Sequence, residues 1–351
     1  MSIQTLPAPR VLFGAGVRWT VQDELQRIGG TRALVLSTPH QSDAAMRIAE
    51  ALGPLAAGVY ARAQMHTPVH ITEDAVAYLK TVQADCIVSI GGGSTTGLGK
   101  AIVHRTGVAH VTIPTTYAGS EATPILGQTE NGTKTTLSDP RVVPDVVLYD
   151  PELIVSLPVE MTVTSALNAI AHAAEALYAP NRTPDSDALA TQGMACFAKY
   201  LPDVIADPSN LKARQETQRG AYACGAVLGQ VGMALHHKLC HTLGGAFDLP
   251  HAATHAIILP HAISYNSRAA RLELGPVCEI FVGETPGLAL HNFAAASGAP
   301  LALRDLGVTL AQLDDAADLA TQKPYPNPAR VTRDGIRQLL EAAWSGAPPQ
   351  H

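Results

Sequence analysis

The sequence predicts two domains of different class: an α/β domain with a mostly parallel sheet over residues 1–157, and an all-helical domain over residues 158–351. Three observations lead to this division. The chain has 351 residues, more than one hydrophobic core usually serves. Up to about residue 150, short apolar runs alternate with amphipathic stretches. After Asp150 and Pro151, alanine-rich amphipathic runs follow and clusters of β-branched residues become rare.

The alternation in the first domain sets the order of its elements. Strands are expected at 33–37, 58–63, 85–90, 109–114 and 146–149, and helices at 42–52, 72–82 and 95–105. Strands that alternate with helices form a parallel sheet covered by helices on its faces. Ligands of such sheets bind at the carboxyl ends of the strands, so the residues that follow each strand are the first candidates for a site.

The second domain shows apolar residues at helical spacing. Helices are expected at 158–178, 185–200 and 211–231, with an all-α architecture as the result. Pro151 and Pro158 both interrupt helices, so we expect the hinge between the domains at 150–158.

Composition narrows the class of partner. The net charge is −6 without a basic cluster, which argues against a nucleic-acid surface. Apolar stretches stay well short of the ~18 residues that cross a bilayer, so no membrane association is expected. Residues 1–10 lack the pattern of a secretory signal, and the five cysteines are scattered without C-x-x-C pairs. A cytoplasmic protein with a small-molecule partner is predicted.

A glycine-rich turn follows the predicted strand at 85–90. It comprises Gly91, Gly92, Gly93 and Ser94, and Gly97 lies in the helix that opens directly after it. Backbone amides without Cβ obstruction, next to a helix N-terminus, suit a phosphate group. The turn therefore predicts the pyrophosphate site of a dinucleotide, although such turns also occur as simple strand-to-helix corners and the spacing is neither G-x-G-x-x-G nor a P-loop.

Two further loops extend this candidate site. Thr115, Thr116 and Ser120 follow the strand at 109–114 and suit the ribose or nicotinamide of a cofactor; taken alone, they form only a polar turn. Thr38 follows the first predicted strand, where an acid would bind the adenosine 2′-hydroxyl and repel a 2′-phosphate. Because threonine does neither strongly, NADH and NADPH should both serve.

Histidines concentrate in the second domain. Six of the 14 in the chain lie between His236 and His261. His237 and His241 share one face of a predicted helix, His251 follows a break expected at Gly244-Gly245, and an earlier helix carries Asn168 and His172, again four residues apart. A single histidine is usually structural, and His236, His255 and His261 are expected to be flanking, structural or rim positions. The combined set has the composition of a metal cage with one amide member.

The glycine turn, the Pro-Thr-Thr loop and the histidine pattern together resemble the iron-containing alcohol dehydrogenase family, with the same architecture as dehydroquinate synthase. In that family an aspartate and three histidines bind a divalent metal. The matching positions are Asn168, His172, His237 and His251, and His241 matches a position that faces the substrate. This chain departs from the pattern at Asn168, which replaces the aspartate, at Gly97, and in the loop at 114–121.

The departures are similar to the maleylacetate reductase branch of the family, in GGGSTTGLGK (91–100), PTTYAGSE (114–121) and HTLGGAFDLPH (241–251). The resemblance implies NADH- or NADPH-dependent reduction of maleylacetate, a small dicarboxylate, to 3-oxoadipate in the breakdown of hydroxyquinol, resorcinol or chlorocatechol. It also implies a homodimer and places Lys134 near the cofactor.

Replacing a carboxylate ligand by the amide of Asn168 removes a negative charge, so we expect no metal. The other interpretation is that a metal is bound weakly through the amide oxygen, or by three histidines and a water molecule. Hydride addition to an alkene conjugated to a ketone gives an enolate. We expect hydrogen-bond donors to stabilise and protonate this enolate and Asn168 to orient the substrate. The candidate donors are His172, His237, His241 and His251.

Three other functions remain open from the sequence. One is a metal-dependent alcohol or aldehyde dehydrogenase of the same family, and another is a lyase of the dehydroquinate synthase group. The third is a non-catalytic nucleotide-binding protein with the same fold.

Overall fold

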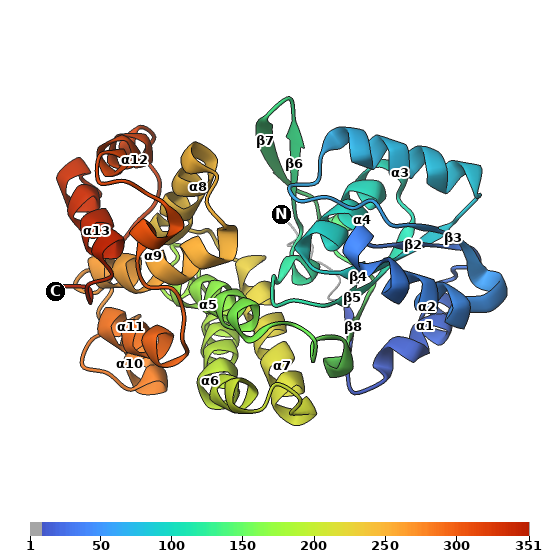
Figure 1. Cartoon of the computed structure of the whole chain (residues 1–351), viewed down its shortest axis with the longest axis horizontal. Helices are drawn as coiled ribbons and strands as arrows, with labels where there is room; N and C mark the ends of the chain where they lie inside the picture. Colours follow the sequence, from blue (N-terminus) through green and yellow to red (C-terminus); the bar gives the residue numbers. More distant parts are fainter. Residues whose placement is uncertain (1–8, 351) are drawn as a thin grey trace. The chain divides into compact units, whose positions relative to one another are not determined.

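The computed structural model describes residues 9–350, so most of the segment used to predict the absence of a secretory signal lies outside the described residues. Two compact units are present (Figure 1). One ends at Leu157 and the other begins at Pro158. No helix in the described part of the chain is both long and apolar enough to span a membrane.

The first unit contains a six-stranded parallel sheet. In spatial order its strands are β1 (Arg10–Phe13), β8 (Val146–Tyr149), β5 (Ala109–Pro114), β4 (Cys86–Gly91), β2 (Ala33–Leu36) and β3 (Ala56–Tyr60). The chain progresses outwards from β2 to β3 and then returns to β4 on the other side of β2. The predicted α/β class is confirmed.

Helices cover both faces of this sheet (Figure 1). They are α1 (Val21–Arg27), α2 (Ser42–Leu52), α3 (Val69–Thr81) and α4 (Gly93–Thr106). Ala33 and Val35 pack with α1 and α2, whereas Leu34 and Leu36 pack with α3 and α4. Because both faces of each central strand are buried, the strands appear as continuous apolar runs rather than alternating ones.

Three elements of this unit were not expected from the sequence: β1, α1, and a two-stranded antiparallel hairpin of β6 (Ile125–Glu130) and β7 (Thr133–Ser138). The hairpin turns at Asn131 and Gly132, both with positive φ. Asn-Gly is the strongest short hairpin signal. However, β7 is polar and almost fully exposed, and β6 has apolar residues only at its start, Ile125 and Leu126, so neither strand shows a sustained apolar alternation.

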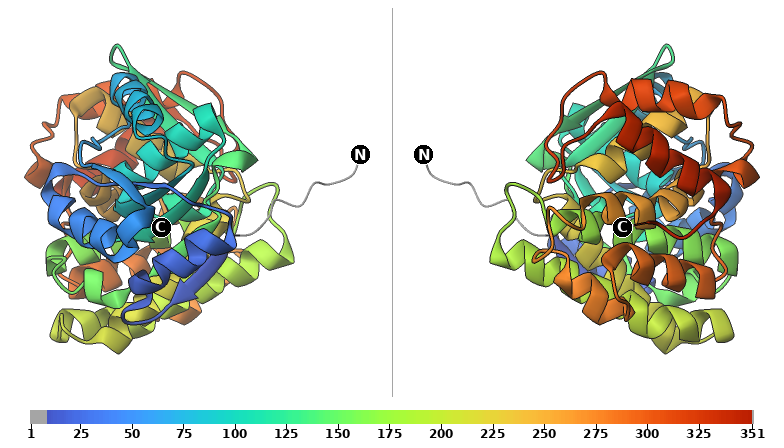
Figure 2. Two further views of the ribbon diagram at one scale, coloured as in Figure 1. Left: turned by 90° about the vertical axis from the view of Figure 1, so that its right-hand side faces the viewer. Right: turned by 90° about the vertical axis from the view of Figure 1, so that its left-hand side faces the viewer.

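The second unit is all-helical, as predicted. Its helices are α5 (Val159–Ala176), α6 (Pro184–Ala206), α7 (Leu211–Leu228), α8 (Leu235–Phe247), α9 (His251–Asn266), α10 (Gly275–Phe281), α11 (Pro286–Ala296), α12 (Gln312–Thr321) and α13 (Arg333–Ser345). In the right-hand view of Figure 2, α12 and α13 lie side by side, with α10 and α11 below them. Helix α5 is buried on almost all sides and contacts α6, α7 and α9, which is typical of a central helix.

The expected break at Gly244-Gly245 is wrong. Helix α8 continues through both glycines to Phe247 and ends where Asp248 adopts the left-handed conformation, at φ 51°. Pro250 then precedes His251, the first residue of α9, in keeping with the preference of proline for helix starts rather than interiors. A glycine pair costs a helix roughly 2 kcal/mol relative to alanine, and packing of α8 against α9 and α12 outweighs this cost.

Candidate active site

Glycine and hydroxyl residues gather at the carboxyl edge of the parallel sheet. Ser37 and Thr38 follow β2, Gly91 ends β4, and Thr115 follows β5. Strand β4 pairs with β2 on one side and with β5 on the other. The direction of chain progression reverses between β2 and β4, and such a switch point is where open α/β sheets bind ligands. The structure thus brings three of the predicted cofactor segments to one edge.

The glycine turn leads from β4 directly into α4. Gly91 has φ +154°, a conformation that side chains rarely adopt. A Cβ atom on Gly92 would lie 2.9 Å from Cγ2 of Thr116, so the turn and the loop after β5 are in close contact. Helix α4 begins at Gly93. The amides of Gly93 and Ser94 therefore belong to the helix N–H groups that have no partner within the helix and that suit an anion.

Two buried hydroxyl groups beside this turn, Ser37 Oγ and Thr95 Oγ1, have no hydrogen-bond partner within residues 9–350. Leaving a buried polar atom unpaired costs about 1–3 kcal/mol, so a ligand that bonds to them is favoured. Thr115 is already oriented, since its Oγ1 accepts a hydrogen bond from Gln41 Nε2 at 2.9 Å. Thr115 and Gln41 line a cavity of about 430 Å³. The glycine turn, the free amides and the unpaired hydroxyls fit a dinucleotide.

Two predicted cofactor residues lie elsewhere. Gly97 is buried inside α4, where an added Cβ would lie 2.5 Å from Thr67 Oγ1. Close packing of Thr67 therefore explains the glycine without a ligand. Lys134 is exposed on β7, on the hairpin rather than at the edge that carries the glycine turn.

Lys100, a residue of α4 that was not predicted to belong to the site, is fully buried. Its Nζ donates hydrogen bonds to the carbonyl oxygens of Ser120 (2.7 Å) and Thr123 (2.8 Å) and to Oγ1 of Thr123 (3.0 Å). Burial lowers the pKa of Lys100 to about 7. The buried Glu121 accepts a hydrogen bond from the Tyr149 hydroxyl at 2.6 Å, and burial raises the pKa of Glu121. These contacts fix the loop that carries the predicted residue Ser120.

Six imidazole rings lie together in the second unit. They are His172 from α5, His236, His237 and His241 from α8, and His251 and His255 from α9. The ring centre of His237 lies 5.2 Å from that of His172 and 6.1 Å from that of His241, and the rings of His251 and His255 are 4.2 Å apart. Asn168 lies one turn before His172 on α5. The predicted polar set is therefore assembled by three helices.

A buried carboxylate that the sequence analysis missed orients this set. Glu175 is 0% exposed, and its Oε2 lies 2.5 Å from Nδ1 of His237. Its Oε1 accepts a hydrogen bond from the backbone N–H of His236 at 2.8 Å. A carboxylate on Nδ1 fixes the tautomer and leaves Nε2 available, as in catalytic and metal-binding histidines. A signal was present, since Glu175 lies three residues after His172 and seven after Asn168, on the same helix face.

Three buried polar atoms of the set have no hydrogen-bond partner among the described residues: Asn168 Oδ1, His172 Nδ1 and His237 Nε2. Burial and the neighbouring imidazoles hold the pKa of His172 well below its usual value, so this ring is neutral. His241 and His251 are exposed. The set can therefore offer hydrogen bonds to a polar ligand, with two of its rings open to solvent.

His236 was expected to be an ordinary flanking position, and this is wrong. The side chain is fully buried, and its Nε2 lies 2.9 Å from Nδ1 of His255. The reason is the inward face of α8, which buries Leu235, His236, Leu239 and Cys240 together. His255 is buried as well, which agrees with its expected structural role.

The donor set at Asn168, His172, His237 and His251 lacks the carboxylate that the family uses as a metal ligand. Three imidazoles and an amide supply no negative charge. Among the described residues, one group of three side chains brings possible metal-ligand atoms within 4.8 Å of one another. It consists of His236, Cys240 and His255. The three histidines at the family's ligand positions do not converge in this way.

Known proteins similar to this chain span its whole length. The iron-containing alcohol dehydrogenase profile matches residues 8–151, and that of the C-terminal part of the Fe-containing alcohol dehydrogenase family matches 162–344. A maleylacetate reductase of Rhizobium sp. (strain MTP-10005) is 54% identical over 346 residues, 99% of this chain and 98% of that protein. One of Burkholderia cepacia is 50% identical over 341 residues, 97% of each. The crystal structure of maleylacetate reductase from Agrobacterium tumefaciens has a TM-score of 0.96 at 52% identity, covering 99% of this chain and 100% of that one.

The Gly92→Ala variant tests the glycine turn. Because the new Cβ would meet Thr116 Cγ2 at 2.9 Å, the turn or the loop after β5 must shift. We expect NADH to bind about tenfold more weakly, a loss of ~1.4 kcal/mol, in a fluorescence titration. Gly127→Ala on the hairpin is the matched control, since its nearest atom would be 3.5 Å away. Unchanged NADH affinity in a folded Gly92→Ala protein would contradict the assignment.

Proposed function

The chain belongs to the iron-containing alcohol dehydrogenase family, and we infer that it reduces maleylacetate, a dicarboxylate whose carbon–carbon double bond is conjugated to a ketone, to 3-oxoadipate. One observation carries this inference: 54% identity to a maleylacetate reductase over 99% of the chain. The alternative of a metal-dependent alcohol or aldehyde dehydrogenase is not favoured, because several full-length relatives at 46–54% identity are maleylacetate reductases.

The first unit supplies the nicotinamide site in this proposal. The reduced nicotinamide, when bound, supplies the hydride. The helix amides at Gly93 and Ser94 receive the pyrophosphate, and the unpaired hydroxyls of Ser37 and Thr95 bond to the rest of the cofactor. Thr38 offers no carboxylate to the adenosine ribose, so both NADH and NADPH are accepted.

The second unit supplies groups for the enolate that hydride addition to the alkene creates. Glu175 Oε2 accepts a hydrogen bond from the Nδ1–H of His237. If Nε2 also carries a proton, the negative charge of the buried carboxylate would offset that of the imidazolium. Such a group stabilises negative charge on the former ketone oxygen. His241 and His251, both exposed, are placed to return a proton to carbon, and Asn168 Oδ1 remains free to orient the substrate.

Metal independence is part of the proposal, although the family is named for iron. It rests on the neutral amide of Asn168 and on histidines that do not converge on one point. An enone needs its oxygen stabilised only as charge develops after hydride addition, and hydrogen-bond donors can do this without a Lewis acid. A pathway role in aromatic breakdown and a homodimeric state are proposed from the same family likeness.

Oxidation of NADH with maleylacetate and with a simple aldehyde, each with and without a strong chelator, tests the function. We expect turnover of maleylacetate alone, at the same rate in both conditions, because no step of the reduction needs a metal. Turnover of the aldehyde that the chelator abolishes would instead indicate the metal-dependent dehydrogenase.

The Glu175→Gln variant tests the positioning of His237. The amide keeps the size and an acceptor oxygen but loses the charge that offsets the imidazolium, so kcat should fall at least about tenfold with KM changed less than about twofold. We also expect the pH profile of kcat to shift in Glu175→Gln and kcat to recover partly in Glu175→Asp. A residue that served only in packing would show neither effect. Glu160→Gln, at an exposed position in the first turn of α5, is the control. Wild-type kcat in Glu175→Gln would remove Glu175 from the account.

A further inference from the structure

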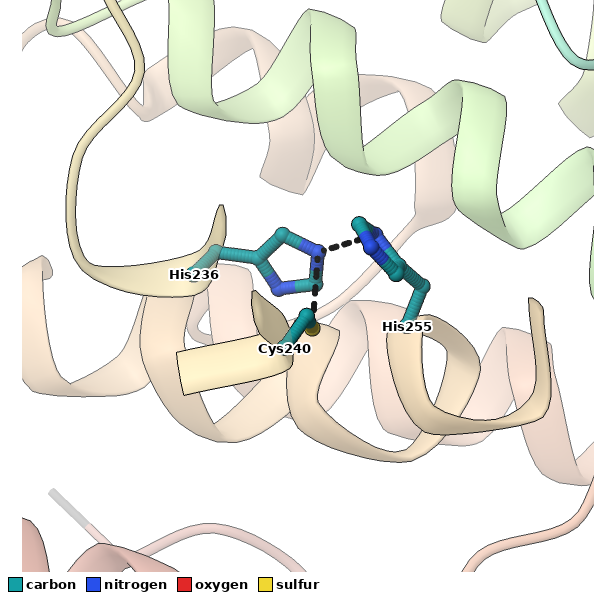
Figure 3. Close-up of side chains that lie close together, drawn as sticks. All are labelled: His236, Cys240 and His255. Atoms are coloured by element: carbon teal, nitrogen blue, oxygen red, sulfur yellow. Dashed lines mark hydrogen bonds between the residues drawn. The ribbon is translucent and has the colours of Figure 1, made fainter. Parts of the chain in front are cut away.

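We propose that His236, Cys240 and His255 form a second, buried binding site for a thiophilic cation such as Zn²⁺ or Co²⁺, separate from the residues at the family's metal positions. Figure 3 shows the three side chains converging: His236 and Cys240 lie one turn apart on α8, and His255 approaches from α9. One ligand atom from each lies within 4.8 Å of the others. All three side chains are at most 2% exposed.

The spacing suits a small tetrahedral ion. Bond lengths of ~2.05 Å to nitrogen and ~2.3 Å to sulfur place two nitrogens ~3.3 Å apart, and a nitrogen and a sulfur ~3.6 Å apart. Here Nε2 of His236 lies 2.9 Å from Nδ1 of His255 and 3.7 Å from Sγ of Cys240. The two imidazoles therefore need to separate by only a few tenths of an ångström.

Little holds the trio in its metal-free arrangement. Within the described chain, His236 Nδ1 and His255 Nε2 have no hydrogen-bond partner, and the other nitrogen of each ring bonds within the trio. Metal binding therefore exchanges two hydrogen bonds within the trio, one between the rings and one between Cys240 and His236, for coordinate bonds. Imidazole binds a metal in its neutral form, through a ring nitrogen that carries no proton.

The charge at the site selects the kind of cation. Cysteine binds a metal as the thiolate, so a metal must displace the thiol proton of Cys240, and that proton leaves for solvent. With a divalent ion bound, the Cys240 thiolate offsets one of its two positive charges. One thiolate and two imidazoles favour Zn²⁺ or Co²⁺ over Mg²⁺ or Ca²⁺, which prefer oxygen ligands.

Titration of chelator-treated, reduced, full-length protein with Co²⁺ alone tests the proposal. Bound Co²⁺ with a thiolate ligand gives a near-ultraviolet charge-transfer band, and we expect this band to saturate at one equivalent and the Tm to rise. Cys240→Ser should lose the band, and Cys278→Ser, at a half-buried cysteine on α10, should keep it. His255→Gln serves as a second loss variant if Cys240→Ser does not fold.

Two results would overturn the site: no charge-transfer band with excess Co²⁺, or a band that persists in Cys240→Ser. Co²⁺ bound without the band would place the ion on histidines alone, as at His172, His237 and His251, and would also overturn it. None of these readouts uses catalytic activity, so failure here and failure of the proposed reduction are distinguishable.

Discussion

The buried carboxylate of Glu175 is the interaction on which the second unit's site depends. It connects α5 to α8 through the side chain of His237 and the backbone of His236. A carboxyl group with 0% exposure is costly to bury unless it is paired and hydrogen-bonded. The start of α8 is therefore held at one position against α5, and the rings that α8 carries take their places from it.

The same carboxylate links the two kinds of chemistry seen around the histidines. On one side, the ring of His237 lies 5.2 Å from that of His172, and Nε2 of His237 has no hydrogen-bond partner among the described residues. On the other, His236 turns inward to His255 and Cys240. Consecutive residues of a helix point in different directions. Glu175 therefore orients both His237, which belongs to an open set with Asn168 and His172, and His236, which belongs to the buried trio with Cys240 and His255. Asn168 contributes a neutral amide, not a carboxylate, to the open set.

Much of the fold could be predicted, because it depends on patterns that are local in sequence. Apolar strands that alternate with helices predicted the parallel sheet, and α2 was predicted residue for residue at 42–52. The glycine turn was recognisable because steric limits dictate glycine there. The β6–β7 hairpin was missed, since β7 is threonine-rich and exposed and β6 has apolar residues only at its start. The helix through Gly244-Gly245 was missed because tertiary packing overrides local propensity. Glu175 and His236 could not be assigned from the sequence, since burial of a polar residue depends on which helix packs against it.

The central claim is that hydride reaches the alkene of maleylacetate and not a carbonyl carbon. Reduction with NADH carrying deuterium at the transferred position, followed by NMR of the product, tests it most directly. The account predicts 3-oxoadipate with one deuterium on the former alkene carbon farther from the ketone, with the ketone intact. Deuterium on a newly formed carbinol carbon, with the double bond retained, would contradict it.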